Sequence, residues 1–368
     1  MKKIILLLAV SLSACINSSF AQYLVAGTYT NNNSTSEGIY IYDFDKTNGS
    51  LKKVSVVAAV NPSYQVVAAD QKNVYSVNET DSGKISAFGF DKKTGALSLH
   101  NTVSAMGDNP CYLELDKTGK WLFCANYSSG SFCIYPVLPD GSLGALSQFV
   151  KHEGSGPDTS RQQSPHVHST TISPDNKFLF VCDLGTDKIV TYPFNATTGK
   201  VDEAHSFFVT TAPGAGPRHI IISKDGKFIY NITEMGGTVS AYRLSGGKLN
   251  LLQTVDALKA EKGKAAGADI HLSPDGNFLY VSQRSNSTIE IFKVNRTNGK
   301  ITFVGDQSTN GNFPRNFTID PSGNYLLAAN QKSDNVTIFK INKATGGLTP
   351  VEPDVTIGIP VSLKWIAK

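Results

Sequence analysis

The sequence has little of what marks a nucleic-acid-binding, membrane-spanning or metal-binding protein. Charged residues make up 17% of the 368 residues, the net charge is +4, and no run of Lys and Arg would follow a phosphate backbone. There is no Cys-x-x-Cys pair and no Cys/His spacing typical of zinc. A Gly-x-Ser-x-Gly elbow, a P-loop and a dinucleotide fingerprint are missing as well. We therefore expect no nucleic-acid partner, no metal and no cofactor.

Residues 1–21 are typical of a secretory signal peptide. Lys2 and Lys3 form a charged start, residues 4–12 form an apolar centre too short to span a bilayer, and a small-residue cleavage site ends at Ala21. A second interpretation is that Leu-Ser-Ala-Cys, ending at Cys15, is a bacterial lipobox, which would make Cys15 a lipid anchor. Both interpretations place the mature protein outside the cytoplasm.

Cysteine use after residue 21 does not require disulfides. An oxidising compartment would permit them. The four remaining cysteines, however, all fall within apolar runs, where a free thiol packs as a small hydrophobic group. They are Cys111, Cys124, Cys133 and Cys182.

One phrase recurs along the chain: a proline, a short apolar run, a turn rich in Asp and Gly, and a second apolar run. The prolines are Pro62, Pro110, Pro165, Pro217, Pro314 and Pro360, at intervals of 48, 55, 52, 97 and 46 residues. The interval of 97 holds a further copy at Ala268 and Asp269, so there are seven copies. No stretch shows sustained helical periodicity. The pattern predicts an all-β, seven-bladed β-propeller with four antiparallel strands per blade.

The two ends of the chain are expected to share one blade. Residues 23–29, 38–44 and 54–59 read as the second, third and fourth strands of a blade that lacks its first strand. Residues 361–367 read as a first strand with no others after it. Pairing the two segments removes the open sheet edge and makes residues 22–368 a single domain.

Polar side chains gather where such a fold would bring them together. The innermost strand of each blade starts at the face of the ring where the second strand ends. Strand starts carry Tyr64, Tyr112, His166, His168, Arg218, His219, Asp269, His271 and Arg315. Strand ends carry Tyr29, Glu79, Asn126, Asp183, Glu234, Arg284 and Gln331. Imidazole, guanidinium and carboxylate groups at one channel mouth indicate an active site, although a solvated channel mouth would also be polar.

Each of these motifs also has a structural interpretation. His166 and His168 are two residues apart, so both side chains would point to the same face of a strand. There they could chelate a metal, transfer protons or hydrogen-bond neighbouring blades. Arg218 and Arg315 could bind a carboxylate or phosphate, or pair with a structural Asp. Glu234 could pair with Arg218 or act as a general acid or base.

The order of these motifs resembles the lactonase family of seven-bladed propellers, which includes propeller-type 6-phosphogluconolactonases and fungal carboxymuconate-lactonising enzymes. The resemblance rests on Gly-Thr-Tyr-Thr at 27–30, Asn-Pro-Cys at 109–111, Pro-His-Val-His at 165–168, Gly-Pro-Arg-His at 216–219, residues 268–276, Pro-Arg at 314–315 and residues 329–331. It departs at Tyr112, where the family commonly has a histidine.

The resemblance implies hydrolysis, or the reverse closure, of a lactone ring at the channel mouth. The implied catalytic residues are His168 (or its neighbour His166), Arg218, Glu234 and Arg284. We expect the substrate to contact His166, His219, His271, Asp269, Arg315, Glu79, Tyr112 and Gln331.

A secreted member is expected to hydrolyse an unphosphorylated sugar lactone without a metal. The alternatives are a non-catalytic propeller that binds a sugar acid or a protein, a muconate-type lactone cyclase, and a metal-dependent gluconolactonase.

Overall fold

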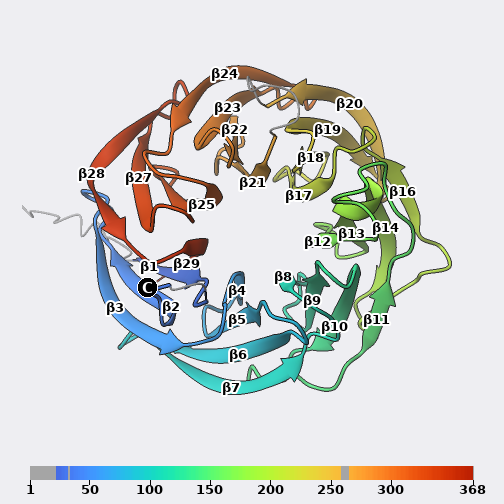
Figure 1. Cartoon of the computed structure of the whole chain (residues 1–368), viewed down its shortest axis with the longest axis horizontal. Coiled ribbons are helices and arrows are strands. Elements are labelled where there is room, and N and C mark those ends of the chain that lie inside the picture. The colour runs from blue at the N-terminus through green and yellow to red at the C-terminus, as the bar shows by residue number, and fades with distance from the viewer. Residues whose placement is uncertain (1–21, 32–33, 258–264, 368) are drawn as a thin grey trace, which may run out of the picture.

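Seven small sheets surround a central axis in the computed structural model, which describes residues 22–31, 34–257 and 265–367 (Figure 1). From the axis outward, the first sheet consists of β29 (Pro360–Ala367), β1 (Gln22–Thr28), β2 (Gly38–Phe44) and β3 (Leu51–Ala58). The second consists of β4 (Gln65–Val67), β5 (Asn73–Asn78), β6 (Lys84–Asp91) and β7 (Ala96–Ser104). The third consists of β8 (Pro110–Leu115), β9 (Trp121–Asn126), β10 (Ser131–Pro136) and β11 (Gln148–Lys151).

The other four sheets repeat this order. The fourth consists of β12 (Val167–Ile172), β13 (Phe178–Asp183), β14 (Lys188–Asn195) and the outer strands β15 (Lys200–Val201) and β16 (Phe207–Thr210), with a 3-10 turn, η1 (Leu184–Thr186), after β13. The fifth consists of β17 (Pro217–Ile222), β18 (Phe228–Thr233), β19 (Thr238–Ser245) and β20 (Lys248–Asp256). The sixth consists of β21 (Gly267–Leu272), β22 (Phe278–Gln283), β23 (Thr288–Val294) and β24 (Ile301–Ser308). The seventh consists of β25 (Pro314–Ile319), β26 (Tyr325–Asn330), β27 (Asn335–Ile341) and β28 (Leu348–Thr356).

The recurring phrase in the sequence is a turn that joins the two inner strands of a blade. In the third and seventh sheets Asp116 and Asp320 accept hydrogen bonds from the backbone amides that follow the turn. In the sixth sheet the hydroxyl of Ser273 accepts from the amide of Phe278 at 3.0 Å, and Gly276 supplies a φ of +72°. These side chains satisfy backbone donors that a tight turn leaves unpaired, which explains why the phrase recurs.

The ends of the chain share a sheet as predicted. β29 pairs antiparallel with β1, with Leu24 opposite Trp365 and Ala26 opposite Leu363 (Figure 1). The predicted signal segment, residues 1–21, and the proposed lipid anchor at Cys15 lie outside the described residues. Within the described part of the chain, no helix is long and apolar enough to cross a bilayer. Four free, buried cysteines agree with the expected packing role.

Side chains link the innermost strands of neighbouring blades around the whole ring. The links are Cys111 Sγ to the carbonyl of His168 (3.5 Å), Ser169 Oγ to the carbonyl of Arg218 (2.7 Å), His219 Nδ1 to Asp269 (2.9 Å), Asn316 Nδ2 to Asp269, the amide of Leu363 to Asn316 Oδ1 (2.7 Å), Lys364 Nζ to the hydroxyl of Tyr64 (3.0 Å), and the stacked rings of Tyr64 and Tyr112 (4.3 Å). Because each innermost strand is linked to a neighbour on each side, the strand starts are held together around the axis.

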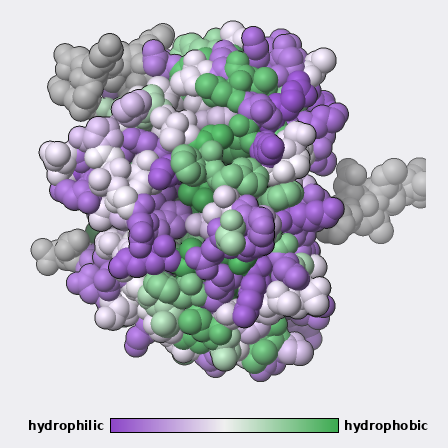
Figure 2. Space-filling view, turned by 90° about the vertical axis from the view of Figure 1, so that its right-hand side faces the viewer, coloured by the Kyte–Doolittle hydropathy of each residue, from purple (hydrophilic) through white to green (hydrophobic). Residues whose placement is uncertain are grey.

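The outer flank carries no continuous apolar band on the side shown in Figure 2, where hydrophobic patches alternate with hydrophilic residues. Single large apolar side chains on outer strands, such as Phe149 and Phe208, are exposed. Isolated exposed residues of this kind are normal for a folded protein.

The closing strand offers a direct test of ring stability. We expect Leu363→Ala to lower the free energy of unfolding by about 2–5 kcal/mol, because Leu363 is 1% exposed and packs in one core cluster with Leu24 and Leu327. Leu251→Ala, at a site 61% exposed, should change it by less than about 0.5 kcal/mol. Urea unfolding of both variants measures the difference, and equal values would contradict the closure described above.

Candidate active site

A polar cup of about 330 Å³ opens at the axis, on the face where innermost strands begin. Its volume lies at the lower end of the range for small-molecule sites, which is roughly 300–1,000 Å³. Every one of the seven sheets contributes to it through a strand start, a strand end or a connecting segment. The residues that line this axial cup are Tyr29, Glu79, Cys111, Tyr127, Arg161, His168, Glu234, Arg284 and Arg315.

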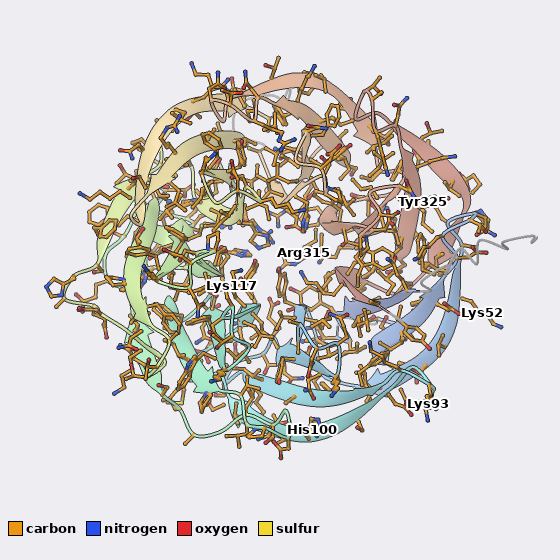
Figure 3. All side chains as sticks on the ribbon, turned by 180° about the vertical axis from the view of Figure 1, so that it is seen from behind. Lys52, Lys93, His100, Lys117, Arg315 and Tyr325 are labelled. Carbon is orange, nitrogen blue, oxygen red and sulfur yellow. The ribbon has the colours of Figure 1, made fainter. Side chains whose placement is uncertain are left out.

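Backbone bulges direct several of these side chains into the axis. The register between the two inner strands shifts around the second residue of β8, β12, β17 and β25. The residues at the shifts are Cys111, His168, Arg218 and Arg315. A bulge inserts an unpaired residue and re-aims its side chain, so these four positions depart from simple alternation. Figure 3 shows Arg315 near the axis, whereas Lys52, Lys93 and His100 lie at the periphery.

Glu234 is the centre of the charged side of the cup. Its Oε2 accepts from Arg218 Nε at 3.0 Å and from an Arg284 amino group at 2.9 Å. Its Oε1 accepts from Arg161 at 2.7 Å. Arg161 is 43% exposed at the mouth, whereas Arg218 is almost fully buried behind Glu234 and does not line the cup. Three guanidinium groups therefore share one carboxylate, and together they carry an excess of positive charge.

The ion pairs around Glu234 set the protonation states of Glu234 and Arg218. Burial alone would raise the pKa of Glu234, but Arg284, Arg218 and Arg161 hold it well below its usual range. Burial, together with Arg284 and Arg315, lowers the pKa of Arg218 to about 10. Both groups are charged at neutral pH. A carboxylate with such a low pKa is a weak base, so Glu234 is better suited to holding the arginines than to activating water.

His168 is a proton acceptor that lines the cup. Burial lowers its pKa well below 6.5, and the nearby charges of Arg218 and Arg315 lower it further. The imidazole is therefore neutral at pH 7. Cys111 Sγ lies 3.9 Å from Nδ1, and no other described residue hydrogen-bonds the ring. One ring nitrogen is thus available to a water molecule or a substrate.

A second layer of polar groups lies beneath the cup. Asp269 accepts from His219 Nδ1 at 2.9 Å and from His271 Nε2 at 3.0 Å, and it also bonds Asn316. Burial would raise the pKa of Asp269, but His271 and His219 keep it well below its ordinary value. Burial and Arg218 lower the pKa of His219 to about 4, so this imidazole is neutral. His219 Nε2 lies 3.4 Å from the Arg218 guanidinium, which connects this layer to Glu234.

The structure divides the sequence-predicted site residues into two groups. Five line the cup: His168, Glu234, Arg284, Arg315 and Glu79. Seven do not: Arg218, His219, Asp269, His271, Tyr112, His166 and Gln331.

Their places differ. Tyr112 stacks on Tyr64 below the cup. His166 precedes β12, which begins at Val167, and stacks on Tyr127 at 4.5 Å. Gln331 follows β26, and its backbone N–H donates to the carbonyl of Phe313 at 3.1 Å.

Four lining residues were not among the predicted site residues: Tyr29, Cys111, Tyr127 and Arg161. Tyr29 was already among the strand-end residues, although it was not among the expected substrate contacts. Tyr127 directly follows β9, so the same strand-end rule could have included it. Cys111 was interpreted only as core. Arg161 lies in the segment between β11 and β12, where the proline interval of 55 residues is the longest single repeat. That extra length was the signal for an inserted functional loop.

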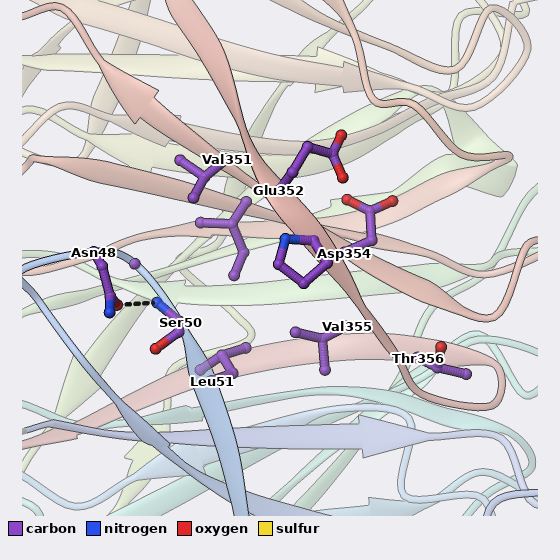
Figure 4. A pocket seen from close by; sticks show the side chains of 11 residues that line it. Asn48, Ser50, Leu51, Val351, Glu352, Asp354, Val355 and Thr356 are labelled. Atoms are coloured by element: carbon purple, nitrogen blue, oxygen red, sulfur yellow. Dashed lines mark hydrogen bonds between the residues drawn. The ribbon is translucent and has the colours of Figure 1, made fainter.

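Further cavities lie away from the axial cup. One lies between β28 and the β2–β3 turn, where the Asn48 side chain is bonded to the backbone of Ser50 at 2.9 Å (Figure 4). Its remaining lining is mainly apolar side chains and backbone, apart from Glu352 and Asp354. Among the described residues, no group of three or more His, Cys, Asp or Glu side chains is placed to hold a metal ion.

The fold and the cup define the class of the protein. A family model described as lactonase, 7-bladed β-propeller, matches residues 23–365. The chain therefore belongs to the lactonase family of seven-bladed propellers.

Named relatives agree with this assignment. The chain is 36% identical over 290 residues to a 6-phosphogluconolactonase of Formosa agariphila, covering 77% of this chain and 82% of that protein. It is 35% identical over 299 residues to a 6-phosphogluconolactonase of Bacillus subtilis, covering 80% of this chain and 84% of that protein. By family and relatives, the chain is an enzyme of the lactone-hydrolase class.

Solved structures support the same family assignment. A candidate 6-phosphogluconolactonase from Bacteroides fragilis superposes with a TM-score of 0.89 at 43% identity, covering 95% of this chain and 99% of that one. The periplasmic gluconolactonase of Pseudomonas aeruginosa also gives a TM-score of 0.89, at 36% identity, covering 94% of this chain and 99% of that one.

The buried neutral histidines predict acid sensitivity. An unfolded histidine titrates near pH 6.5, whereas folded His219 titrates near 4, so the unfolded chain binds more protons between these values and stability falls as the pH drops. The contribution of one such histidine is up to about 1.4 kcal/mol per pH unit.

We therefore expect His219→Asn, which keeps a donor for Asp269, to flatten the pH dependence of the free energy of unfolding between pH 6.5 and 4.5. His100→Asn, at an exposed site where the ring hydrogen-bonds the neutral side chain of Asn73, should leave the slope unchanged. Urea titrations across this range measure both slopes, and identical slopes would show that His219 is not buried in its neutral form.

Proposed function

We propose that this protein hydrolyses a sugar lactone in the axial cup, in the manner of a 6-phosphogluconolactonase and without a metal. The observation that carries the proposal is one neutral imidazole, His168, in the same cup as Arg161, Arg284 and Arg315. Ester hydrolysis requires a base for water and positive charge for the oxygen that becomes negative. The cup provides both.

Each step can be assigned to a residue. His168 removes a proton from water as the water oxygen attacks the lactone carbonyl carbon. Arg284, assisted by Arg161, stabilises the resulting oxyanion. The tetrahedral intermediate then collapses, the bond between the carbonyl carbon and the ring oxygen breaks, and the His168 imidazolium protonates the departing oxygen. The product is the open-chain hydroxy acid.

Glu234 and Arg218 act through the other arginines in this proposal. Glu234 fixes Arg284 and Arg161 by direct ion pairs, and Arg218 holds Glu234 from behind. Arg218, assigned a catalytic role by resemblance, is therefore a positioning residue. Without the carboxylate, three guanidinium groups would repel one another within the cup.

We further propose that the protein works outside the cytoplasm on an unphosphorylated sugar lactone. The proposal rests on the signal-like composition of residues 1–21 and on similarity to a gluconolactonase named periplasmic. Three arginines, Arg161, Arg284 and Arg315, and two glutamates, Glu79 and Glu234, line the cup, and Arg218 lies behind them. The resulting excess of positive charge also suits the carboxylate of the product.

The first test addresses the proposed base. We expect His168→Gln to lower kcat for glucono-δ-lactone by roughly 10²–10⁴-fold, because proton transfer contributes by this amount. Wild-type kcat/KM should stay constant from pH 7.5 down to pH 6, since the pKa of His168 is depressed. Acid release against the uncatalysed rate measures both, with His205→Gln as the control. Activity retained by His168→Gln would remove His168 from the mechanism.

The second test addresses the arginine cluster. Glu234→Gln and Arg218→Ala should each lower kcat/KM by at least roughly tenfold, since each disconnects a buried ion pair that positions Arg284. Circular dichroism and thermal unfolding confirm that the variants are folded, and EDTA should not affect the wild type. If both variants retain wild-type turnover, the assignment fails.

A further inference from the structure

A second carboxylate, Glu79, lies across the ring from Glu234. Glu79 follows β5 in the second sheet, and Glu234 follows β18 in the fifth, so they are three sheets apart around the axis (Figure 1). Both line the cup. Tyr29, from the first sheet, and Arg315, from the seventh, stand next to Glu79 on the same side.

The two carboxylates differ in their partners. Both oxygens of Glu234 are taken by guanidinium groups. The Oε2 of Glu79 accepts from the hydroxyls of Tyr29, at 2.9 Å, and Ser63. No described residue hydrogen-bonds its Oε1. Glu79 thus presents an unused acceptor to the cup.

Arg315 supplies donors beside that acceptor. Its nearest carboxylate oxygen is Glu79 Oε2, at 3.9 Å, and its guanidinium lies over the Tyr29 ring at 5.6 Å. No hydrogen bond to another described residue occupies it. An available acceptor and an available set of donors stand side by side in a part of the cup that is 15–17% exposed.

The backbone around Glu79 is rigidly held. Asn61 adopts a φ of +41°, and its side chain accepts from the amide of Thr30 at 2.9 Å and donates to the carbonyl of Glu79 at 3.1 Å. The amide of Glu79 in turn donates to the carbonyl of Asn61 at 3.0 Å. Asn61 therefore fixes the segments that carry Tyr29 and Glu79 relative to each other. Strained backbone held in this way is typical of binding sites.

We propose that Glu79, Tyr29 and Arg315 form a polyol subsite that selects lactones with free vicinal hydroxyls. Glu79 Oε1 accepts from one hydroxyl, and Arg315 donates to its neighbour. Paired acceptors and donors are what adjacent hydroxyls require, because each is both a donor and an acceptor. The subsite depends on the proposed function in one respect: a lactone bound there must direct its reacting carbonyl toward His168 and Arg284.

The test compares two lactones with the same ring size, glucono-δ-lactone, which has hydroxyls on the ring, and δ-valerolactone, which has none. In Glu79→Gln the amide oxygen keeps the bonds from Tyr29 and Ser63, so an NH₂ group replaces the free acceptor. We expect the ratio of kcat/KM values for the two lactones to fall by at least tenfold (about 1.4 kcal/mol), mainly through a higher KM for gluconolactone. Glu153→Gln, at an exposed site, is the matched control. An equal loss on both lactones, or an unchanged ratio, would overturn the proposal.

A binding experiment keeps the subsite testable even if no lactone is hydrolysed. Calorimetry compares gluconate with 5-hydroxypentanoate, the ring-opened acid of δ-valerolactone, which has no vicinal hydroxyls. Wild type should bind gluconate at least tenfold more tightly, and Glu79→Gln should remove that preference. Equal binding of both acids by the wild type would refute the subsite. Absence of turnover together with selective gluconate binding would refute the proposed reaction alone.

Discussion

Closure of seven sheets into a ring is the constraint on which everything else in this molecule depends. The β29–β1 pairing joins the two ends of the chain, and side-chain links such as His219–Asp269 and Asn316–Asp269 join each innermost strand to the next. One blade of a repeat fold cannot bury its hydrophobic faces alone. Within the ring each sheet packs against two others. The strand starts are then held close enough to the axis for residues from all sheets to form one cup.

A cup of this kind concentrates buried charge. Arg161, Arg218 and Arg284 would be unstable together in a partly buried space without Glu234, since an unpaired buried charge is strongly unfavourable. The same pairing sets the chemistry. Arg161, Arg218 and Arg284 hold the pKa of Glu234 low, so it is a weak base. Burial, with the charges of Arg218 and Arg315, lowers the pKa of His168 and keeps its imidazole neutral. Stability and reactivity therefore follow from a single electrostatic arrangement.

The cup has two sides with different character. On one side a saturated carboxylate organises guanidinium groups, which suits an oxygen that becomes negative. On the other side Glu79 keeps an oxygen unused beside Arg315, which suits neutral hydroxyls. A lactone has one reactive carbonyl and a separate set of ring substituents, so two such sides can orient it. The layer of His219, Asp269 and His271 beneath them supports the arrangement without lining the cup.

The repeated turns, the spacing of the prolines and the complementary ends of the chain were enough to predict seven blades and their closure. These are local properties, because turn residues and strand alternation act over a few neighbours. The same rules identified His168, Glu234, Arg284, Arg315 and Glu79. They did not identify the lining residues Cys111, Tyr127 and Arg161. They predicted His219, Asp269 and Tyr112 at the channel mouth, whereas these three do not line the cup. A bulge turns a side chain away from simple alternation, and the reach of a loop residue such as Arg161 depends on contacts 73 residues away in sequence. Which polar residues line the cup and which support it was therefore decided only by the packing of neighbouring blades.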